Sequence, residues 1–597
     1  MSIREHERAR AKEELTILVL GGYGTFGARI VALLESDPRL TLIVAGRSLE
    51  KARRFCDARS GAVARLHPVE LDRDGDVEAK LASLRPDILV DASGPFQAYG
   101  DEPYHVVKAC IARRVNYLDL ADGSQFVAAI RTFDEEALSA GCFVLSGVSS
   151  FPVLTAAVTR RLSHDLARVD VIRGGIAPSP YAGIGENVMR AIAGYAGQPT
   201  TLKRDAKLTI GRPLLEHMRF TIAPPGSLPL RNTLFSLVDV PDLVALTKLW
   251  PEANTIWMGA GPVPEILHRA LIAFAWLVRL RILRSLSFLA PLMHFVSRHV
   301  RWGEHRGGMF VEVEGENASG KKIRRSWQLL AERDDGPLIP SMAVEAVVKA
   351  IQHGDAPKAG ARVAVRDIEL HQYEELFAGR QITTGVRDEN GEDQPLYRRI
   401  LKSAWEDLPS QIREMHRGDA FSRAQGRATI ERGSSVFSKL CAALIGFPEA
   451  GEDTAVTVEF EAKHGAEIWT RRFDKKAFSS RQFAGTGRSS KLLCERFGPL
   501  VFALALVLDA GKLRLVLRRW SLFGVPLPLW LGPRADACES VEQGRFQFHV
   551  EIGHVLTGLI VRYRGWLVLS RDVLSGEDLH AHRRQSCQSR EPRHSDV

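Results

Sequence analysis

Short apolar runs alternate with amphipathic segments over the first 150 residues of the chain. The run TILVLG is followed by GARIVALLESD and then by LTLIVAGR, and the alternation continues through DILVDAS and CFVLSG. β-Branched runs separated by helical segments are typical of βαβ units in a parallel sheet. Because these runs contain few polar positions, we expect strands that are buried on both faces. The pattern predicts an α/β domain over residues 14–150.

The regular alternation of strand-like and helical segments ends after Pro152. Residues 151–385 mix helical segments with strands such as MFVEVEGE and RRSWQLLAE, which predicts a second, α+β domain for the substrate. The acidic, polar stretch from Val386 to Gln394 is typical of a linker.

One segment of the second domain, residues 265–300, is strongly apolar but interrupted by arginines. Its charge-free pieces, 270–278 and 285–293, are about half of the roughly 18 residues that span a bilayer, so we expect no crossing. Pro291 predicts a break in the helix.

Two interpretations of this segment stay open. In one, Leu271, Ile272, Phe274 and Trp276 enter a membrane interface while the arginines reach anionic headgroups. In the other, the segment is a core helix or a homodimer contact, because its arginines do not share one face.

In the third region, residues 397–570, polar and apolar positions alternate strictly. Val456, Val458 and Phe460 share one face, and the run RFQFHVEI alternates in the same way. The pattern predicts a β-rich domain of antiparallel strands. A sheet wrapped against a helix can enclose an apolar ligand, although an ordinary packed core is the simpler interpretation. The polar tail, residues 577–597, is expected to be disordered.

Composition narrows the function further. The 597 residues are 45% hydrophobic and 25% charged with a net charge of +9, which fits a globular protein that meets an anionic cofactor or an acidic membrane surface. No concentrated basic stripe with aromatics supports nucleic-acid binding. The seven scattered cysteines and the charged N-terminus indicate reduced thiols, no metal site and no signal peptide. We therefore expect a cytoplasmic protein, with peripheral contact to the inner membrane face if residues 265–300 bind lipid.

The strongest motif is G-x-G-x-x-G, placed between the first strand and the first helix. Gly22 permits the tight turn, Gly24 leaves room for a pyrophosphate, and Gly27 lets the helix pack on the strand. Thr25 and Phe26 lie in the same loop. The motif in this context predicts a Rossmann-type dinucleotide site.

The residue that discriminates between NAD and NADP is expected about twenty positions after the motif. An acidic residue there would bind the ribose of NAD, but this chain has Arg47, followed by Ser48. An arginine can bind a 2′-phosphate, so NADP is the predicted cofactor.

Several segments together resemble the saccharopine dehydrogenase NADP-binding family. They are GGYGTFGARI, VAGR, LDRD, DASGPFQAYG and NYLD, and the resemblance extends over residues 14–380. It implies that Gly22, Gly24, Gly27 and Arg47 bind the cofactor, that Asp72 approaches its adenosine half, and that Ser93, Gly94 and Pro95 lie beside its nicotinamide. The C-terminal segments CERFGPL, GVPLPLWLGP, GRFQFHVEI and LIVRYRGWL resemble domain-of-unknown-function family 4166.

Members of the saccharopine dehydrogenase family reduce imines or enoyl lipids, so the resemblance implies hydride transfer to an apolar or amino-acid-derived substrate. Tyr99 and Asp122 are the preferred proton donors near the expected nicotinamide, with His105 and Asp119 as further candidates. Each also has a structural interpretation, as pocket lining, helix surface, turn or cap. The alternative function is a non-catalytic, NADP-occupied scaffold that binds lipid at a membrane surface.

Overall fold

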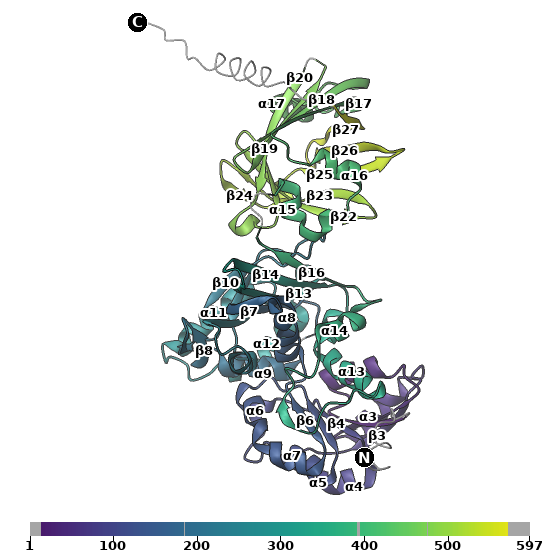
Figure 1. The fold of residues 1–597 in the computed structure, drawn as a ribbon, viewed down its shortest axis with the longest axis vertical. Coiled ribbons are helices and arrows are strands. Elements are labelled where there is room, and N and C mark those ends of the chain that lie inside the picture. The colour runs from purple at the N-terminus through teal and green to yellow at the C-terminus, as the bar shows by residue number, and fades with distance from the viewer. Residues whose placement is uncertain (1–13, 184, 391–393, 475, 571–597) are drawn as a thin grey trace. The chain divides into compact units, whose positions relative to one another are not determined.

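The computed structural model describes residues 14–183, 185–390, 394–474 and 476–570. The predicted disorder of residues 577–597 therefore lies outside the described residues. The chain forms two compact units, residues 1–391 and residues 392–597. Figure 1 shows helices and strands throughout the first unit and mostly strands in the second.

The first sheet of unit 1 has seven strands, all parallel, which confirms the predicted Rossmann-type α/β fold. Across the sheet the strands are β3 (Arg65–Glu70), β2 (Leu40–Gly46), β1 (Leu15–Leu20), β4 (Ile88–Asp91), β5 (Asn116–Asp119), β6 (Phe143–Ser146) and β15 (Gly360–Val363). The helices that connect them are α2 (Thr25–Leu34), α3 (Leu49–Asp57), α4 (Val77–Leu84), α5 (His105–Arg113), α6 (Ser124–Ala129) and α7 (Asp134–Ala140).

Both faces of this sheet are buried, as the apolar runs predict. On β1, Ile17 and Val19 join one hydrophobic core, whereas Leu18 and Leu20 join a second core on the opposite face. The first core also contains the apolar side of α13 (Ile339–Gln352), which packs against α2. The last strand, β15, pairs with β6 although six of the seven strands of the second sheet lie between them in sequence.

The second sheet of unit 1 also has seven strands and is mixed: β12 and β7 are parallel, and the other pairs are antiparallel. Its strands are β10 (His217–Phe220), β11 (Thr233–Leu237), β12 (Thr255–Ala260), β7 (Leu166–Ala177), β13 (Gly307–Asn317), β14 (Lys322–Ala331) and β16 (Ile382–Asp388). Around it lie the hairpin β8 (Thr200–Arg204) and β9 (Lys207–Gly211) and the helices α8 (Thr155–Ser163), α9 (Glu186–Tyr195), α10 (Asp242–Leu249), α11 (Glu265–Arg279), α12 (Ala290–His299) and α14 (Leu370–Phe377).

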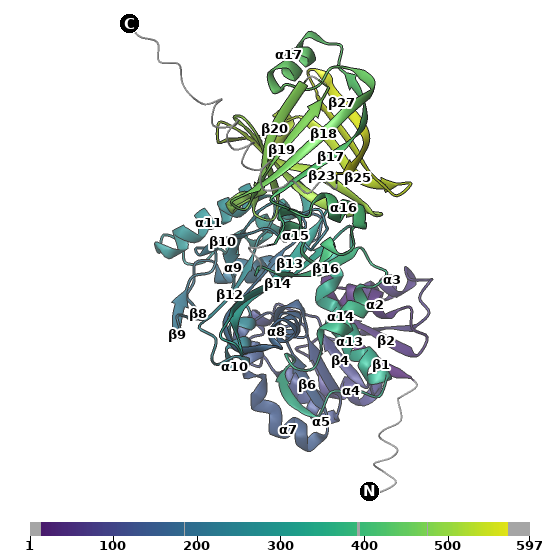
Figure 2. The same ribbon diagram turned by 45° about the horizontal axis from the view of Figure 1, so that its top comes forward.

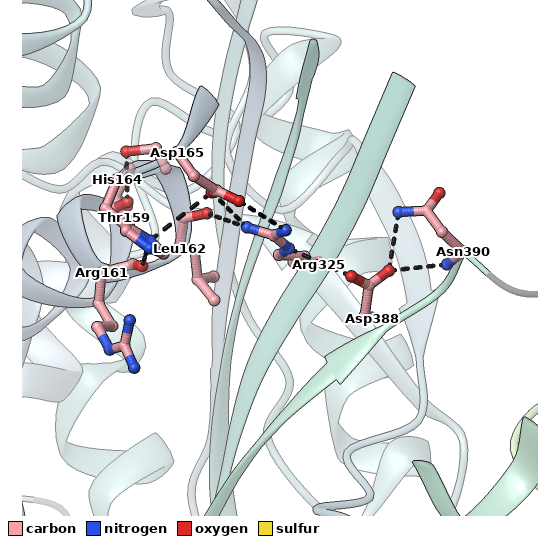
Figure 3. A network of polar contacts seen from close by, with 9 residues as sticks. Thr159, Arg161, Leu162, His164, Asp165, Arg325, Asp388 and Asn390 are labelled. Carbon is pink, nitrogen blue, oxygen red and sulfur yellow. Dashed lines mark hydrogen bonds and ion pairs between the residues drawn. The ribbon is translucent and has the colours of Figure 1, made fainter. Parts of the chain in front are cut away.

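Arg325 on β14 holds the end of this sheet together (Figure 3). Its guanidinium binds both carboxylate oxygens of Asp165, at 2.5 and 2.9 Å, and reaches Asp388 at the end of β16 at 3.3 Å. Asp388 in turn accepts a hydrogen bond from the backbone amide of Asn390. The predicted linker therefore begins too early, because pairing with β14 extends β16 through Asp388.

The apolar segment at residues 265–300 forms two helices rather than one. The break covers residues 280–289, and Pro291 lies in the first turn of α12. The prediction that Pro291 ends a helix was wrong, because a proline is tolerated in a first turn, where its missing N–H has no intrahelical partner. No helix among the described residues is long and apolar enough to span a bilayer.

Unit 2 is a closed antiparallel barrel of ten strands, in which β22 and β23 complete the ring and β24 extends from β23. Its strands are β17 (Phe421–Arg432), β18 (Gly451–Lys463), β19 (Ala466–Phe473), β20 (Lys476–Ala484), β21 (Leu493–Phe497), β22 (Leu500–Asp509), β23 (Lys512–Leu522), β24 (Val525–Leu527), β25 (Arg534–Glu542), β26 (Arg545–His554) and β27 (Gly558–Leu569). The described part of this unit also contains the α-helices α15 (Leu396–Leu401), α16 (Ser410–Met415) and α17 (Val436–Ile445). Val456, Val458 and Phe460 point into the barrel core, as their alternation predicts.

Candidate nucleotide and substrate site

The turn from β1 to α2 is built from glycines in close contact. Gly21 has a φ of +77°, and a Cβ on it would lie 2.9 Å from the carbonyl oxygen of Ala92. A Cβ on Gly27 would lie only 2.2 Å from the carbonyl oxygen of Gly21, so only glycine lets the helix approach this turn. The left-handed position, Gly21, precedes the motif and was not predicted.

Gly24 has a different environment from Gly27. It is the N-cap of α2, with extended backbone, and a Cβ there would meet only the backbone of Gly21, at 3.0 Å for its carbonyl oxygen. The space beside it is otherwise open, and the free N–H groups of the first helical turn begin here. This arrangement fits a pyrophosphate. Thr25 is exposed and Phe26 is half-buried in the same turn.

Arg47, the residue predicted to select NADP over NAD, directly follows β2. Arg47 is exposed there, and the Oγ of Ser48 caps α3 by accepting from the backbone N–H of Lys51. Tyr23 extends from the glycine turn across this edge, where its hydroxyl accepts from the Ser48 N–H at 3.0 Å. A Cβ on Gly46 would lie 2.6 Å from the Tyr23 ring. The sequence analysis missed this contact, since nothing in the spacing connects the two segments.

The loop after β4 contains a hydrogen-bonded group formed by Asp91, Ser93 and Tyr99. The Ser93 hydroxyl donates to Asp91 at 2.6 Å and lies 2.9 Å from the Tyr99 hydroxyl. Burial raises the pKa of both the Asp91 carboxyl and the Tyr99 phenol. The Arg73 guanidinium lies over the Tyr99 ring, 3.1 Å from its centroid. Tyr99 is 8% exposed, so this group fixes the loop more than it faces a substrate.

The other expected residues are distributed around this edge. Asp72 is exposed and accepts a hydrogen bond from the backbone amide of Asp74. Gly94 and Pro95 continue the loop after Ser93. His105 is directed to the carbonyl oxygen of Gly75, 3.0 Å away, which is a structural contact on α5.

Asp119 ends β5 and is completely buried. Its Oδ1 accepts from the backbone amides of Gly147 and Ala121 and from the Ser146 hydroxyl, at 2.7 to 3.0 Å. Burial nevertheless raises the pKa of the carboxyl to about 7. Oδ2 has no hydrogen-bond partner among the described residues. Asp119 is thus a structural residue.

Asp122 lies at the open side of the same loop. It accepts a hydrogen bond from Gln97 Nε2 at 2.9 Å, and its pKa is raised by burial and by the charge of Asp239. Burial and the charges of Asp122 and Asp239 raise the pKa of Tyr195, at the end of α9. Tyr195 and Asp239 were not predicted, because both come from the second domain in sequence and reach the first only through folding.

A segment of the second domain covers the nucleotide turn. The Arg29 guanidinium on α2 donates to the carbonyl oxygens of Ala182 and Gly183, at 3.0 and 3.2 Å. A Cβ on Gly185 would lie 2.9 Å from the Thr25 hydroxyl oxygen. The segment that leads into α9 therefore lies against the first turn of α2.

Comparison with known proteins agrees with this geometry. Residues 17–145 match the family model described as the saccharopine dehydrogenase NADP binding domain, and residues 408–567 match that of a domain of unknown function, DUF4166. A comparison with curated proteins gave no match.

Among solved structures, the chain is similar to saccharopine dehydrogenase (L-Glu forming) from Saccharomyces cerevisiae, with 15% identity and a TM-score of 0.45 over 62% of this chain and 100% of the other. GenD2 from gentamicin A biosynthesis, in complex with NAD, has 16% identity and a TM-score of 0.31 over 64% and 98%. A mutant meso-dapdh from Clostridium tetani has 14% identity and a TM-score of 0.31 over 61% and 99%.

The parallel sheet, the glycine turn and the first family match define the class of unit 1, a dehydrogenase-type oxidoreductase with a nicotinamide dinucleotide. More particularly, its N-terminal part matches the saccharopine dehydrogenase NADP binding domain over residues 17–145, and the barrel matches DUF4166 over residues 408–567.

Proposed function

We propose that the chain is an NADP-dependent oxidoreductase that reduces the C=N bond of an imine or the C=C bond of an enoyl group in an apolar or amino-acid-derived substrate. The observation that carries the proposal is Asp122, a half-buried carboxyl with a raised pKa beside the loop that follows β4. A carboxyl whose pKa is raised holds its proton more firmly than an ordinary aspartate, which suits it to act as a general acid.

The residues of the turn fit the cofactor. The open space at Gly24 and the N-terminus of α2 would receive the pyrophosphate, and Arg47 with Ser48 would bind the 2′-phosphate. Ser93, Gly94 and Pro95 would lie beside the nicotinamide, at the carboxyl end of β4. Reduced NADP, when bound, supplies the hydride.

Asp122 donates the proton that accompanies the hydride. It protonates the nitrogen of an imine, or the carbon next to the carbonyl of an enoyl group, while the hydride reaches the other end of the double bond. Gln97 orients the carboxyl through its 2.9 Å hydrogen bond, and partial exposure lets water restore the proton. Tyr99 acts as a positioning residue in this proposal, because it is bonded to Ser93 beneath Arg73.

The proposal of an apolar substrate is supported by exposed apolar side chains on α11, α12 and the turn between them. We call this region the α11–α12 surface. Its buried side is a small core around Ala275 and Val278, and Leu271 and Ile272 are only half-buried. The exposed large apolar side chains are Ile266, Leu267, Phe274, Trp276, Leu280, Ile282, Phe288, Leu292 and Phe295. Arg279, Arg281, Arg284 and Arg298 are exposed along the same segment.

Exposed apolar area of this extent on one segment is typical of an interaction site, and the interspersed arginines are complementary to anionic headgroups. We therefore include peripheral binding to the cytoplasmic face of an anionic membrane in the proposed function. A second copy of the chain on the α11–α12 surface is the competing occupant.

The experiment is NADPH oxidation by the full chain, with crude lipid and imine pools as substrates. We expect turnover with one pool, and a decrease of at least about 100-fold for Asp122→Asn with little change in NADPH affinity. Asp101→Asn, at an exposed carboxylate of the preceding loop, is the matched control. NADPH binding without turnover on either pool would favour the alternative, a lipid-binding scaffold that holds NADP.

A further inference from the structure

The barrel of unit 2 encloses a cavity of about 430 Å³. Its walls are mostly aromatic and aliphatic side chains, including Phe460, Phe473, Phe502, Leu515, Phe548 and Ile560. This volume lies in the range of small-molecule sites, and ten strands enclose more space than the side chains of this barrel fill. Of the two interpretations that the sequence left open, the cavity favours the one in which the barrel holds an apolar ligand.

One group of polar residues in the wall, around Arg471, forms a network in which the charges are compensated. Arg471 donates to Glu495 at 3.0 Å and to the Ser480 hydroxyl at 2.9 Å. Gln482 also donates to Glu495, and it accepts a hydrogen bond from the Tyr397 hydroxyl at 3.1 Å. The positive charge of Arg471 is therefore compensated within the protein.

A second carboxylate in the wall, Glu539, binds the buried His416 at 2.6 Å. An anionic ligand would thus meet two carboxylates, Glu495 and Glu539, and one arginine that is already paired, beside the imidazoles of His549 and His554. Because a charge without a partner is costly in an apolar cavity, the wall favours an uncharged ligand with a group that exchanges hydrogen bonds.

One end of the barrel carries the helix α17 (Figure 2). Cys441 and Ile445 on this helix line the cavity. Phe437 and Leu444 on the same helix are 68% and 80% exposed, so α17 is apolar toward the cavity and toward solvent. The only charged residue within the helix is Lys439.

The neighbouring turn between β26 and β27 extends this apolar surface. Val555 and Leu556 are exposed there, and the Ser435 hydroxyl ties the start of α17 to this turn through the carbonyl oxygen of Thr557 at 2.8 Å. An exposed apolar helix directly above an apolar cavity matches a surface that exchanges ligand with a hydrocarbon phase.

From these observations we propose that the barrel binds one uncharged lipid with a hydroxyl or carbonyl head, which enters from a bilayer past α17 and the β26–β27 turn. The chain length of the lipid is limited by the cavity, and its head exchanges hydrogen bonds with the Arg471, Glu495 and Gln482 network. This site is separate from the nucleotide site, so its failure would leave the oxidoreductase proposal intact.

The first test is displacement of the neutral dye Nile red from the full chain. Hexadecanol should displace the dye at a concentration at least tenfold lower than hexadecanoate, which has the same chain length but an anionic head. Equal or better displacement by hexadecanoate would overturn the choice of an uncharged head. No displacement by either would overturn the ligand site.

Two variants locate the site. Cys441→Trp adds an indole on the cavity side of α17 and should weaken hexadecanol binding at least tenfold, whereas Leu440→Trp adds it on the exposed side and should not. Leu517→Trp, on β23 in the cavity wall, should weaken hexadecanol binding in the same way as Cys441→Trp. This second variant provides the test if Cys441→Trp does not fold. Unchanged binding in a folded cavity variant contradicts the proposal.

The entry route is tested by the rate of transfer of a fluorescent fatty alcohol from phosphatidylcholine vesicles. Leu444→Ser should slow transfer several-fold while equilibrium binding stays unchanged. Val568→Ser is the control, because Val568 is also an exposed apolar residue, at 51%, but lies at the far end of β27 from the β26–β27 turn, where Leu569 pairs with Ala424. Slower transfer in the control alone would place the entry at that other end.

Discussion

The side-chain amide of Asn187 donates a hydrogen bond to the carbonyl oxygen of Gly94 at 2.8 Å. Gly94 belongs to the loop expected beside the nicotinamide, and Asn187 lies in the first turn of α9, which ends at Tyr195. One hydrogen bond therefore joins the loop of the nucleotide sheet to the helix that ends at Tyr195, the tyrosine whose pKa the charge of Asp122 helps to raise.

We expect Asn187→Ala to weaken NADPH binding by a factor of about 2 to 10, because one hydrogen bond contributes roughly 0.5–1.5 kcal/mol and the loop becomes less preorganised. Titration calorimetry gives the affinity. Arg190→Ala, which removes an exposed ion pair with Glu186 on the same helix, is the control and should bind normally. Equal effects of the two variants would argue against a specific role of the Asn187 contact.

Arg47→Asp should lower the affinity for NADPH about 10- to 100-fold and leave that for NADH unchanged or higher. A charge-assisted hydrogen bond to the 2′-phosphate contributes about 1.5–3 kcal/mol, and aspartate instead favours a free ribose hydroxyl. Arg53→Asp makes the same charge change at an exposed position of α3. If wild-type protein binds both dinucleotides equally, Arg47 is not the discriminator.

The two motif glycines should separate binding from folding. Gly24→Val places a branched side chain in the open space of the turn, so NADPH binding should be lost while the thermal unfolding temperature changes little. Gly27→Ala should instead lower that temperature clearly, because its Cβ would lie 2.2 Å from the carbonyl oxygen of Gly21. Normal binding by Gly24→Val would place the pyrophosphate elsewhere.

Asp119 should make the free energy of unfolding depend on pH. Its pKa is about 7 in the folded chain, above the ordinary value of about 4, so the folded state binds more protons between these values. This contribution to stability is present in full below pH 4 and is lost as the pH rises to 7, at no more than about 1.4 kcal/mol per pH unit.

Asp119→Asn should therefore flatten the pH dependence of stability between pH 5 and 7, as measured by urea unfolding. Asp242→Asn should act similarly, since burial raises the pKa of Asp242 to about 7 as well. A wild-type profile with the same slope as that of Asp119→Asn would show that the carboxyl is ionised throughout.

Flotation with vesicles tests the α11–α12 surface. The full chain should float with anionic vesicles, less with neutral vesicles, and less again at high salt because screening weakens the arginine contacts. The double variant Phe288→Asp/Phe295→Asp should abolish flotation. Leu138→Asp, at an exposed leucine of α7, should not. A chain that never floats but dimerises through this surface would establish the second copy as its occupant.

Much of unit 1 could be predicted because its signals are local. The apolar runs of β1 and β2 identify strands with two buried faces, and the glycine motif identifies the nucleotide turn. The strand β15 could not be predicted in this way, because its sequence GARV has no apolar run and it is a strand only through pairing with β6.

In the candidate site too, residues with a local sequence signal could be predicted, whereas contacts that depend on tertiary packing could not. Arg73 follows Asp72 in sequence, but its position over Tyr99 depends on how two loops approach each other. Tyr195 and Asp239 lie far along the chain from Asp122, and only the packing of the two sheets brings their charges together. In the barrel, alternation identifies the inward residues, whereas closure through β22 and β23 depends on strand register, which alternation alone does not encode.

The return of the chain to the first sheet has a consequence for synthesis on the ribosome. Ala361 of β15 pairs with Val144 of β6, so this edge of the nucleotide sheet stays open until about 200 further residues have been translated. During that interval β6 is an unprotected edge strand, and a nascent chain nearby can supply the missing strand. A fragment that stops at residue 150 would keep that edge, and we expect it to aggregate or exchange strands where the full chain does not.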